Sequence, residues 1–202
     1  QAKVAAYETG ELDALGSAPY YVADTYAGKS DLKQSSVLVT NYILFNINME
    51  PFDDVKVRQA FALAVNRTDI TTAIGAQSYI PSTTFVAKRY KSKVDGSEWG
   101  DVQETLLDEN LEKAKELLKE AGYENGEGLP EITYTYPAMS YEAEVAQVLQ
   151  AQWKELGVDV KLQAMEYEVY VDERRSGKLQ LARHQWTGDY GDPATWLDMY
   201  RE

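Results

Sequence analysis

The regular alternation of helical and strand-like segments in the second half of the chain constrains the fold more than any other feature. Helical periodicity covers residues 108–121, 141–156 and 167–176, and strand-like runs cover residues 132–136, 158–164 and 179–185. Gly122, Gly157 and Gly177 each follow a helical segment, and glycine ends helices because it adopts a left-handed backbone without steric cost. Strands that alternate with helices of about ten or more residues predict an α/β fold with a largely parallel or mixed sheet flanked by helices.

The first half of the chain supplies one further buried strand and one further amphipathic helix. Residues 36–46 are rich in β-branched and aromatic side chains, which favours a buried strand. A helix follows, in which Asp53 and Asp54 offer an N-cap. Its apolar stripe consists of Val57, Ala60, Phe61, Ala64 and Val65.

The remaining segments are short or irregular. We expect a short helix that ends at Gly10, a brief strand over residues 11–14, and a long surface loop over residues 78–105. No internal repeat, proline-rich linker or low-complexity tract divides the chain. We therefore predict that residues 1–202 form a single α/β lobe.

The charge balance excludes nucleic-acid partners. The 202 residues contain 20 Lys and Arg against 33 Asp and Glu, which gives a net charge of −13 at pH 7. Such a surface repels phosphate, because phosphate binding needs a basic face. The hydrophobic content of 44% is sufficient to build a core, so disorder is not expected.

The chain has no cysteine and a single histidine, His184, and this removes most catalytic chemistry. A disulfide, a thiolate or multi-histidine metal site and a cysteine nucleophile are all excluded, and we expect no metal and no cofactor. No Gly-x-Ser-x-Gly elbow accompanies His184, which we interpret as a strand residue that is partly exposed or packed against a neighbour. Gly126-Glu127-Gly128 lacks the rest of a phosphate loop and is interpreted as a turn. No catalytic residue is predicted.

The two ends of the sequence indicate a piece of a longer protein. No window approaches the roughly 20 apolar residues of a membrane helix, and the first residues lack the pattern of a signal peptide. The chain begins at Gln1 and stops in the middle of a pattern at Glu202. We expect that it has been excised from a longer chain.

One region concentrates the side chains of a recognition surface. Residues 167–197 contain large aromatic side chains, separated arginines and isolated acids. Aromatic groups give contact area at low entropic cost, and isolated charges fix the orientation of a ligand. The alternative is that the aromatic groups belong to the core and the charges are solvated, and composition alone does not decide between the two.

Four motifs, in order along the chain, carry a family resemblance. Residues 10–13 read GELD, residues 51–60 read PFDDVKVRQA, residues 114–123 read AKELLKEAGY and residues 186–193 read WTGDYGDP. This set resembles the oligopeptide- and dipeptide-binding proteins of bacterial ABC importers, family 5 of the extracellular solute-binding proteins. The resemblance implies a type II periplasmic-binding-protein architecture, in which two lobes close over a ligand. Because family members are more than twice as long, the chain would be the C-terminal lobe.

The resemblance also implies ligand contacts. Asp189 falls on the acid that pairs with the peptide α-ammonium, and Trp186 falls on an aromatic residue beside it. Arg183 and Arg174 match arginines that receive a terminal carboxylate. The other implied contacts are Tyr167, which would form a pocket wall, and Thr187, which is closer to the dipeptide binders.

The function implied by the resemblance is the capture of oligopeptides or dipeptides by a monomeric, extracytoplasmic protein. It would deliver them to the permease subunits of an ABC importer and would meet the membrane only through a lipid anchor outside this chain. Three alternatives remain: a binder of another small solute such as a nickel chelate or a sugar, a peptide-signal receptor or adhesion module, and a hydrolase. The hydrolase is disfavoured by the absence of a paired nucleophile and base. The isolated lobe is expected to fold but to bind peptide poorly, because half of the cleft is missing.

Overall fold

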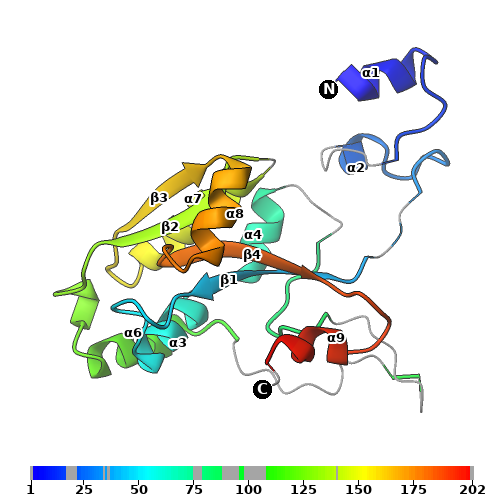
Figure 1. The fold of residues 1–202 in the computed structure, drawn as a ribbon. Coiled ribbons are helices and arrows are strands. Elements are labelled where there is room, and N and C mark those ends of the chain that lie inside the picture. Colours follow the sequence, from blue (N-terminus) through cyan, green and yellow to red (C-terminus); the bar gives the residue numbers. More distant parts are fainter. Residues whose placement is uncertain are drawn as a thin grey trace.

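Four strands form one mixed sheet in a computed structural model of the chain (Figure 1). The structure describes residues 2–16, 22–33, 35, 37–74, 79–87, 96–97, 108–139 and 141–200. The strands are β1 (Val39–Phe45), β2 (Ile132–Pro137), β3 (Val160–Met165) and β4 (Leu181–Thr187). The helices are α1 (Ala2–Glu8), α2 (Val22–Thr25), α3 (Val55–Leu63), α4 (Arg67–Ala73), α6 (Leu111–Glu120), α7 (Glu142–Lys154), α8 (Tyr167–Arg175) and α9 (Ala194–Leu197), with 3₁₀ turns η1 (Glu124–Gly126) and η2 (Asp198–Tyr200).

The strand order is β1-β4-β2-β3, and it places β4 in the interior of the sheet. Strand β2 runs parallel to both β3 and β4, whereas β1 pairs antiparallel with β4 over its whole length, from Val39 opposite Thr187 to Phe45 opposite Leu181. The carboxyl ends of the three parallel strands therefore meet at one edge of the sheet, where ligands bind in open α/β sheets. The predicted mixed sheet with flanking helices is confirmed.

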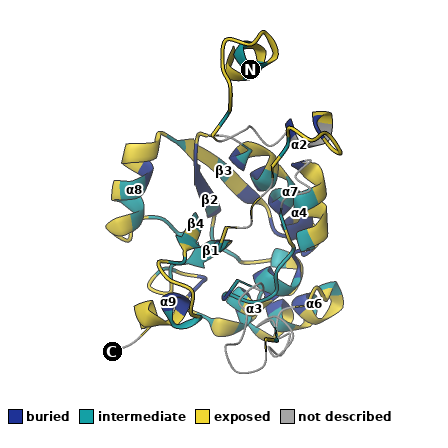
Figure 2. Ribbon diagram, turned by 90° about the vertical axis from the view of Figure 1, so that its right-hand side faces the viewer, coloured by how far each residue is buried: buried dark blue, intermediate teal, exposed yellow. Residues whose placement is uncertain are grey.

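The main core lies between the sheet and helices α3, α6 and α7. Helices α7 and α8 cover opposite faces of the sheet (Figure 2). Trp153 of α7 is fully buried, its ring lies 5.3 Å from that of Phe61 of α3 in a tilted arrangement, and its indole N–H donates to the Phe61 carbonyl at 3.1 Å. Aromatic residues of this size bury the most apolar area per side chain, so this contact fixes α7 against α3.

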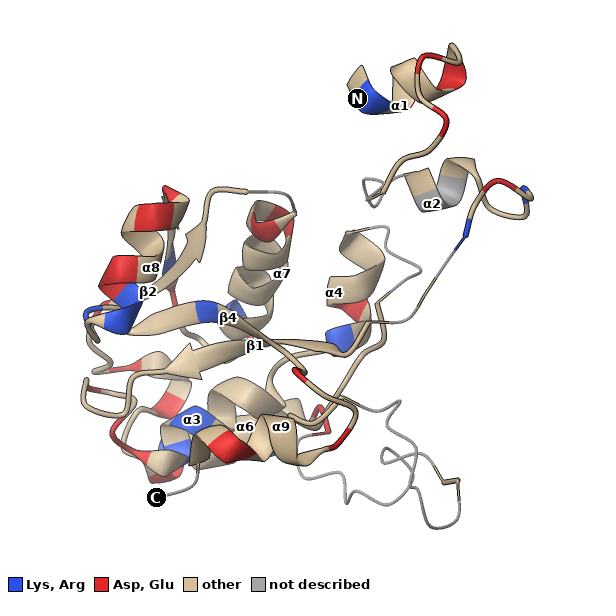
Figure 3. Cartoon of the chain, turned by 45° about the vertical axis from the view of Figure 1, so that its right-hand side comes forward, with Lys and Arg blue, Asp and Glu red and all other residues tan. Residues whose placement is uncertain are grey.

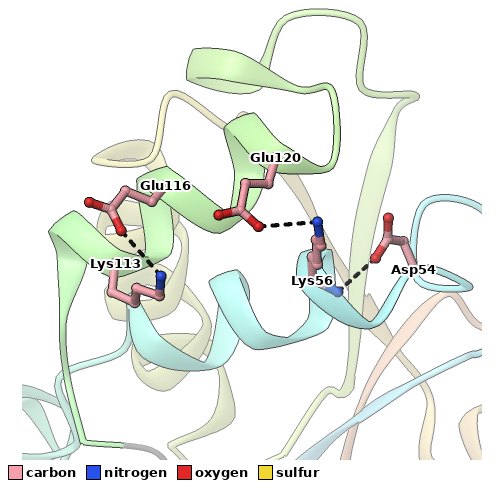
Figure 4. Close-up of polar contacts among 5 residues, drawn as sticks. All are labelled: Asp54, Lys56, Lys113, Glu116 and Glu120. Atoms are coloured by element: carbon pink, nitrogen blue, oxygen red, sulfur yellow. Dashed lines mark hydrogen bonds and ion pairs between the residues drawn. The ribbon is translucent and has the colours of Figure 1, made fainter.

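Helix α3 begins at an Asp54 cap, and its first turn is joined to α6 by an ion pair (Figure 4). Asp54 is the N-cap of α3 and accepts a hydrogen bond from the Lys56 amide at 2.7 Å, which confirms its interpretation as a cap. The Lys56 ammonium then reaches Glu120 of α6 at 3.1 Å. Because both side chains are exposed, this pair contributes little, whereas the cap contributes about 1 kcal/mol.

A close contact between two glycines joins η1 to the end of α7. Gly126 and Gly157 have φ of 78° and 82°, and a Cβ on Gly157 would lie 2.2 Å from the Asn125 carbonyl oxygen. A Cβ on Gly126 would lie 2.3 Å from the Gly157 oxygen. The two backbones touch at a distance that only glycine permits. The segment around Gly126 is therefore a packing turn, as predicted.

One prediction in the first half of the chain is wrong, and one helix was missed. Residues 11–14 form bends and not a strand, and they follow α1, which has no buried residue. A short helix, α4, was not predicted; it begins because Asn66 accepts hydrogen bonds from the amides of Thr68 and Asp69 at 2.9 and 3.0 Å. The predicted long loop over residues 78–105 lies largely outside the described residues, although 79–87 contain no helix or strand.

Helices α1 and α2 stand apart from the sheet (Figure 1). They are held to each other by Tyr26, whose hydroxyl donates to Glu8 at 3.0 Å and whose ring lies 6.3 Å from that of Tyr7. That residues 1–202 form a single α/β lobe stays a prediction. No helix within the described ranges combines the length and the apolar character that a membrane-crossing helix needs.

Candidate functional site

Strand β4 carries the candidate site because its side chains alternate between the two faces of the sheet. Arg183 contacts α7 on one face, and His184 contacts α8 on the other. Trp186 follows on the His184 face, and Thr187 ends the strand. Figure 3 shows basic positions on β4 and acidic positions along α8 and α6. The alternation along β4 therefore assigns Arg183 to the α7 face of the sheet and Trp186 to the α8 face.

Arg183 is neutralised inside the chain. Its Nε lies 2.8 Å from Glu142 Oε1, and its Nη2 donates to Asn41 Oδ1 at 2.9 Å. The Arg183 carbonyl also accepts a hydrogen bond from the Tyr170 hydroxyl. Burial raises the pKa of Glu142, whose side chain is 5% exposed, and Arg183 offsets part of this effect. Separating such a buried pair leaves an uncompensated charge, so Arg183 is fixed to α7 and β1.

Two tyrosines lie beside the Glu142–Arg183 pair. Tyr141 precedes α7, and its hydroxyl lies 2.5 Å from that of Tyr79. Burial, reinforced by this hydrogen bond, raises the pKa of Tyr141. The Tyr141 hydroxyl therefore stays protonated at neutral pH.

Arg174 has different surroundings from those of Arg183. One Nη of Arg174 lies 3.1 Å from His184 Nε2, and its Nε is buried without a hydrogen-bond partner in the described part of the chain. No carboxylate among the described residues forms an ion pair with Arg174. Within the described ranges its positive charge thus has no counter-charge, which favours an anion at this position.

His184 is packed and neutral. Its ring lies 5.2 Å from that of Tyr42 on the neighbouring strand. Burial, followed by the charges of Arg174 and Arg183, lowers the pKa of His184 to about 4. The expectation of a strand residue packed against a neighbour is confirmed.

The segment after β4 presents Asp189 next to a tryptophan pair. Trp196 of α9 is fully buried and donates to Thr40 Oγ1 at 3.1 Å, and Trp186 packs in the same cluster. The indole N–H of Trp186 is buried without a partner in the described part of the chain. The Asp189 amide donates to Thr195 Oγ1 at 3.1 Å, which fixes the backbone while the residue stays exposed.

The carboxylate of Asp189 has no hydrogen bond or ion pair to any described residue. Asp192 behaves differently, because its Oδ1 accepts from the Ala194 amide at 2.9 Å and so begins α9. The Asp192 carboxylate is therefore already engaged at the start of α9. Asp189 is thus the acid of this segment that is available to a ligand.

Tyr167 and Thr187 flank this edge of the sheet. Tyr167 begins α8 directly after β3 and is 52% exposed, and Thr187 is the exposed last residue of β4. The sheet order places β2 between their strands, so the two residues lie on the same edge but are not neighbours. The structure thus gathers Asp189, Trp186 and Thr187 at the end of β4, with Tyr167 farther along the edge.

Sequence reasoning missed the partners that distinguish the two arginines. Glu142, Asn41 and Tyr42 contact Arg183 or His184, and none belongs to a recognised motif. Glu142 stands in the first turn of a helix, where an acid is ordinary because it suits the helix dipole. No signal in the sequence separates it from the exposed acids of other helices.

The mixed sheet flanked by helices matches the fold of solved periplasmic peptide-binding proteins. The crystal structure of a periplasmic oligopeptide-binding protein from Borrelia burgdorferi superimposes with a TM-score of 0.81 at 28% identity, covering 99% of this chain and 39% of that one. The chain belongs to the bacterial extracellular solute-binding proteins, family 5, whose middle-region model matches residues 1–202.

Two curated relatives come from Bacillus subtilis. The chain is 30% identical over 197 residues to the dipeptide-binding protein DppE and 30% identical over 203 residues to the oligopeptide-binding protein OppA. These matches cover 96% and 97% of the chain but only 36% and 37% of the relatives. The family consists of extracellular or periplasmic solute-binding proteins and not of enzymes, which confirms the expectation that the chain is not catalytic.

Proposed function

We propose that the chain forms the peptide-binding lobe of an ABC-importer solute-binding protein, in which Asp189 holds the α-ammonium of the peptide. The observation that carries this proposal is the exposed Asp189 carboxylate, which has no partner among the described residues while its backbone is held by Thr195. An ammonium that leaves water needs a carboxylate or its desolvation forbids binding. Trp186, which packs with the Trp196 cluster three residues before Asp189, would supply an aromatic wall.

The carboxylate end of a peptide is better matched by Arg174 than by Arg183. Arg183 is paired with Glu142, whereas Arg174 has no carboxylate partner among the described residues. A guanidinium binds a carboxylate through two parallel hydrogen bonds, which suits a terminal carboxylate. Arg183 acts chiefly through its backbone and through the network that it anchors. Tyr167 and Thr187, exposed at the same edge, contribute walls for the peptide side chains.

The relatives support a role in peptide uptake. DppE and OppA are dipeptide- and oligopeptide-binding proteins, and each aligns with nearly all of this chain over about a third of its own length. We infer an extracytoplasmic protein, attached by a lipid anchor outside this chain, that closes two lobes over a peptide and presents it to permease subunits. Lobe closure by a hinge is the usual way in which such proteins signal that they are loaded.

Calorimetric titration of the natural protein with tri-alanine, in free-amine and N-acetylated forms, tests the proposal. Only the free-amine form is expected to bind tightly. Asp189→Asn should weaken its binding by about 2–5 kcal/mol, because one partner of a desolvated charge pair is lost. Asp159→Asn is the matched control. Asp159 is an exposed acid that directly precedes β3, at the opposite end of the parallel strands from Asp189. Equal binding of both peptide forms would remove Asp189 as the anchor, and binding of neither would argue for a non-peptide solute.

A further inference from the structure

We propose that His184 is a positioning residue for Arg174, because its imidazole accepts a hydrogen bond from the guanidinium and so holds that cation in the orientation that a ligand anion meets. This inference rests on the proposed function and extends it to a residue that does not itself touch the ligand. The contact on which it depends is the 3.1 Å separation between an Arg174 Nη and His184 Nε2.

The chemistry of the two groups determines the state of the imidazole. A guanidinium carries five N–H donors and no acceptor. A hydrogen bond between Arg174 and His184 Nε2 is possible only if Nε2 is the acceptor, so the ring is neutral and its proton lies on Nδ1. The geometry therefore specifies one tautomer of His184 in the ligand-free protein.

The surroundings of His184 favour this neutral state from every side. Strand β1 contributes the Tyr42 ring, α8 contributes Arg174, and β4 itself contributes Arg183. Tyr42 is in turn influenced by Tyr200 of η2, and burial raises the pKa of Tyr42 to about 12, so no tyrosinate forms nearby. None of the described carboxylates perturbs the ring. Protonation of His184 would therefore add a cation beside two arginines.

Arg174 depends on this one contact for its orientation. Among the described residues, His184 is its hydrogen-bond partner, and its buried Nε has none. A long side chain loses rotamer entropy when it is fixed, and a partner that fixes it beforehand removes that cost from ligand binding. Loss of the His184 acceptor would leave the Arg174 guanidinium charged but would no longer hold it in one orientation.

The first experiment reads the pair without any ligand. Nitrogen NMR of histidine-labelled natural protein reports the tautomer of His184, whose signal is assigned by its loss in His184→Gln. We expect an unprotonated Nε2, a proton on Nδ1, and a titration midpoint well below the ordinary value near 6.5. A proton on Nε2, or titration near 6.5, would overturn the proposal.

The second experiment reads the consequence for binding. Tri-alanine with a free carboxylate and tri-alanine amide are titrated into the natural protein, His184→Leu and His184→Gln. We expect the leucine variant to lose about tenfold in affinity for the carboxylate form and to keep its affinity for the amide. Glutamine places an amide oxygen near the position of Nε2 and should restore most of the loss. Thermal unfolding of each variant checks that it is folded.

The outcomes separate this proposal from the proposed function. If the natural protein binds tri-alanine and His184→Leu binds it equally well, the positioning role is wrong and the peptide-binding function stands. If the natural protein binds neither peptide, the proposed function fails, and the ligand role of Arg174 and His184 fails with it. A loss in His184→Leu that His184→Gln does not restore would contradict the hydrogen-bond acceptor role.

Discussion

At the scale of single residues, the partners of the two arginines determine which of them is available to a ligand carboxylate. The family resemblance implies the same role for both, which is to receive a ligand carboxylate. The structure gives Arg183 a buried acid, Glu142, and gives Arg174 a neutral imidazole. Because the deciding contacts come from α7 and β1, far away in the sequence, local pattern could not reveal them. Asp189 was easier to identify, because it lies inside a recognisable motif.

The depressed pKa of His184 leads to a prediction about stability. An unfolded histidine binds a proton near pH 6.5, whereas burial and the two arginines lower the pKa of folded His184 to about 4. The stabilisation is therefore complete above pH 6.5 and is lost as the pH falls from 6.5 toward 4. After allowance for solvent screening, we expect a loss of roughly 1–2 kcal/mol.

Urea unfolding of the natural protein between pH 7 and pH 4 measures this loss. His184→Gln carries no titrating ring and is the control, because all carboxylates remain in both proteins. The difference in unfolding free energy between the two proteins should change across this window. A constant difference would mean that His184 titrates alike in the folded and unfolded states.

At the scale of elements, helix periodicity and glycine stops predicted α6, α7 and α8 well, since each has an apolar stripe and an abrupt end. Sequence reasoning was less successful for elements that depend on a single capping residue or that do not pack against the core. Helix α4 follows its N-cap Asn66 immediately after the α3 stripe, and its residues show no apolar stripe that would predict a second helix. The GELD segment at residues 10–13 has strand-like residues but buries nothing in this structure.

The backbone contact between η1 and the end of α7 predicts unequal costs at two similar glycines. Gly157→Ala should destabilise the natural protein by roughly 3 kcal/mol, because a left-handed backbone is strained and the Cβ would overlap Asn125. Gly122→Ala is the matched control. Gly122 also has positive φ, at 93°, but no atom lies within 4 Å of the new Cβ, so only the conformational cost of about 1 kcal/mol remains.

Denaturant unfolding of both variants compares the two costs. The prediction concerns their difference, which reports the overlap with Asn125 and not the preference of glycine for positive φ. Equal losses in the two variants would show that the turn moves aside without cost. A smaller loss at Gly157 than at Gly122 would contradict the packing described here.

At the scale of the whole molecule, composition and alternation were enough to predict a non-catalytic α/β lobe. They were not enough to place α1 and α2, which pack on each other through Tyr7 and Tyr26 and stand apart from the sheet. Periodicity indicates which face of a helix is apolar, but it does not indicate which other helix or sheet that face packs against. The fold of the sheet region was therefore predictable, and the attachment of the first 35 residues was not.

The proposed closure of two lobes predicts a change in size when peptide binds. Small-angle X-ray scattering of the natural protein should give a smaller radius of gyration with saturating tri-alanine than without it. At the same peptide concentration, Asp189→Asn should keep the radius of the ligand-free protein, and Asp159→Asn should contract like the natural protein. An unchanged radius in the natural protein with bound peptide would argue for a rigid cleft.

The alternation of side chains along β4 has a consequence for how this protein changes during evolution. Because neighbouring residues point to opposite faces, one inserted or deleted residue before Arg183 would turn the arginine toward α8 and the histidine toward α7. Both partnerships would be lost in one step, whereas a substitution loses only one. Descendants of this gene should therefore vary β4 in residue type while keeping its length, and should accommodate length changes beyond Gly188.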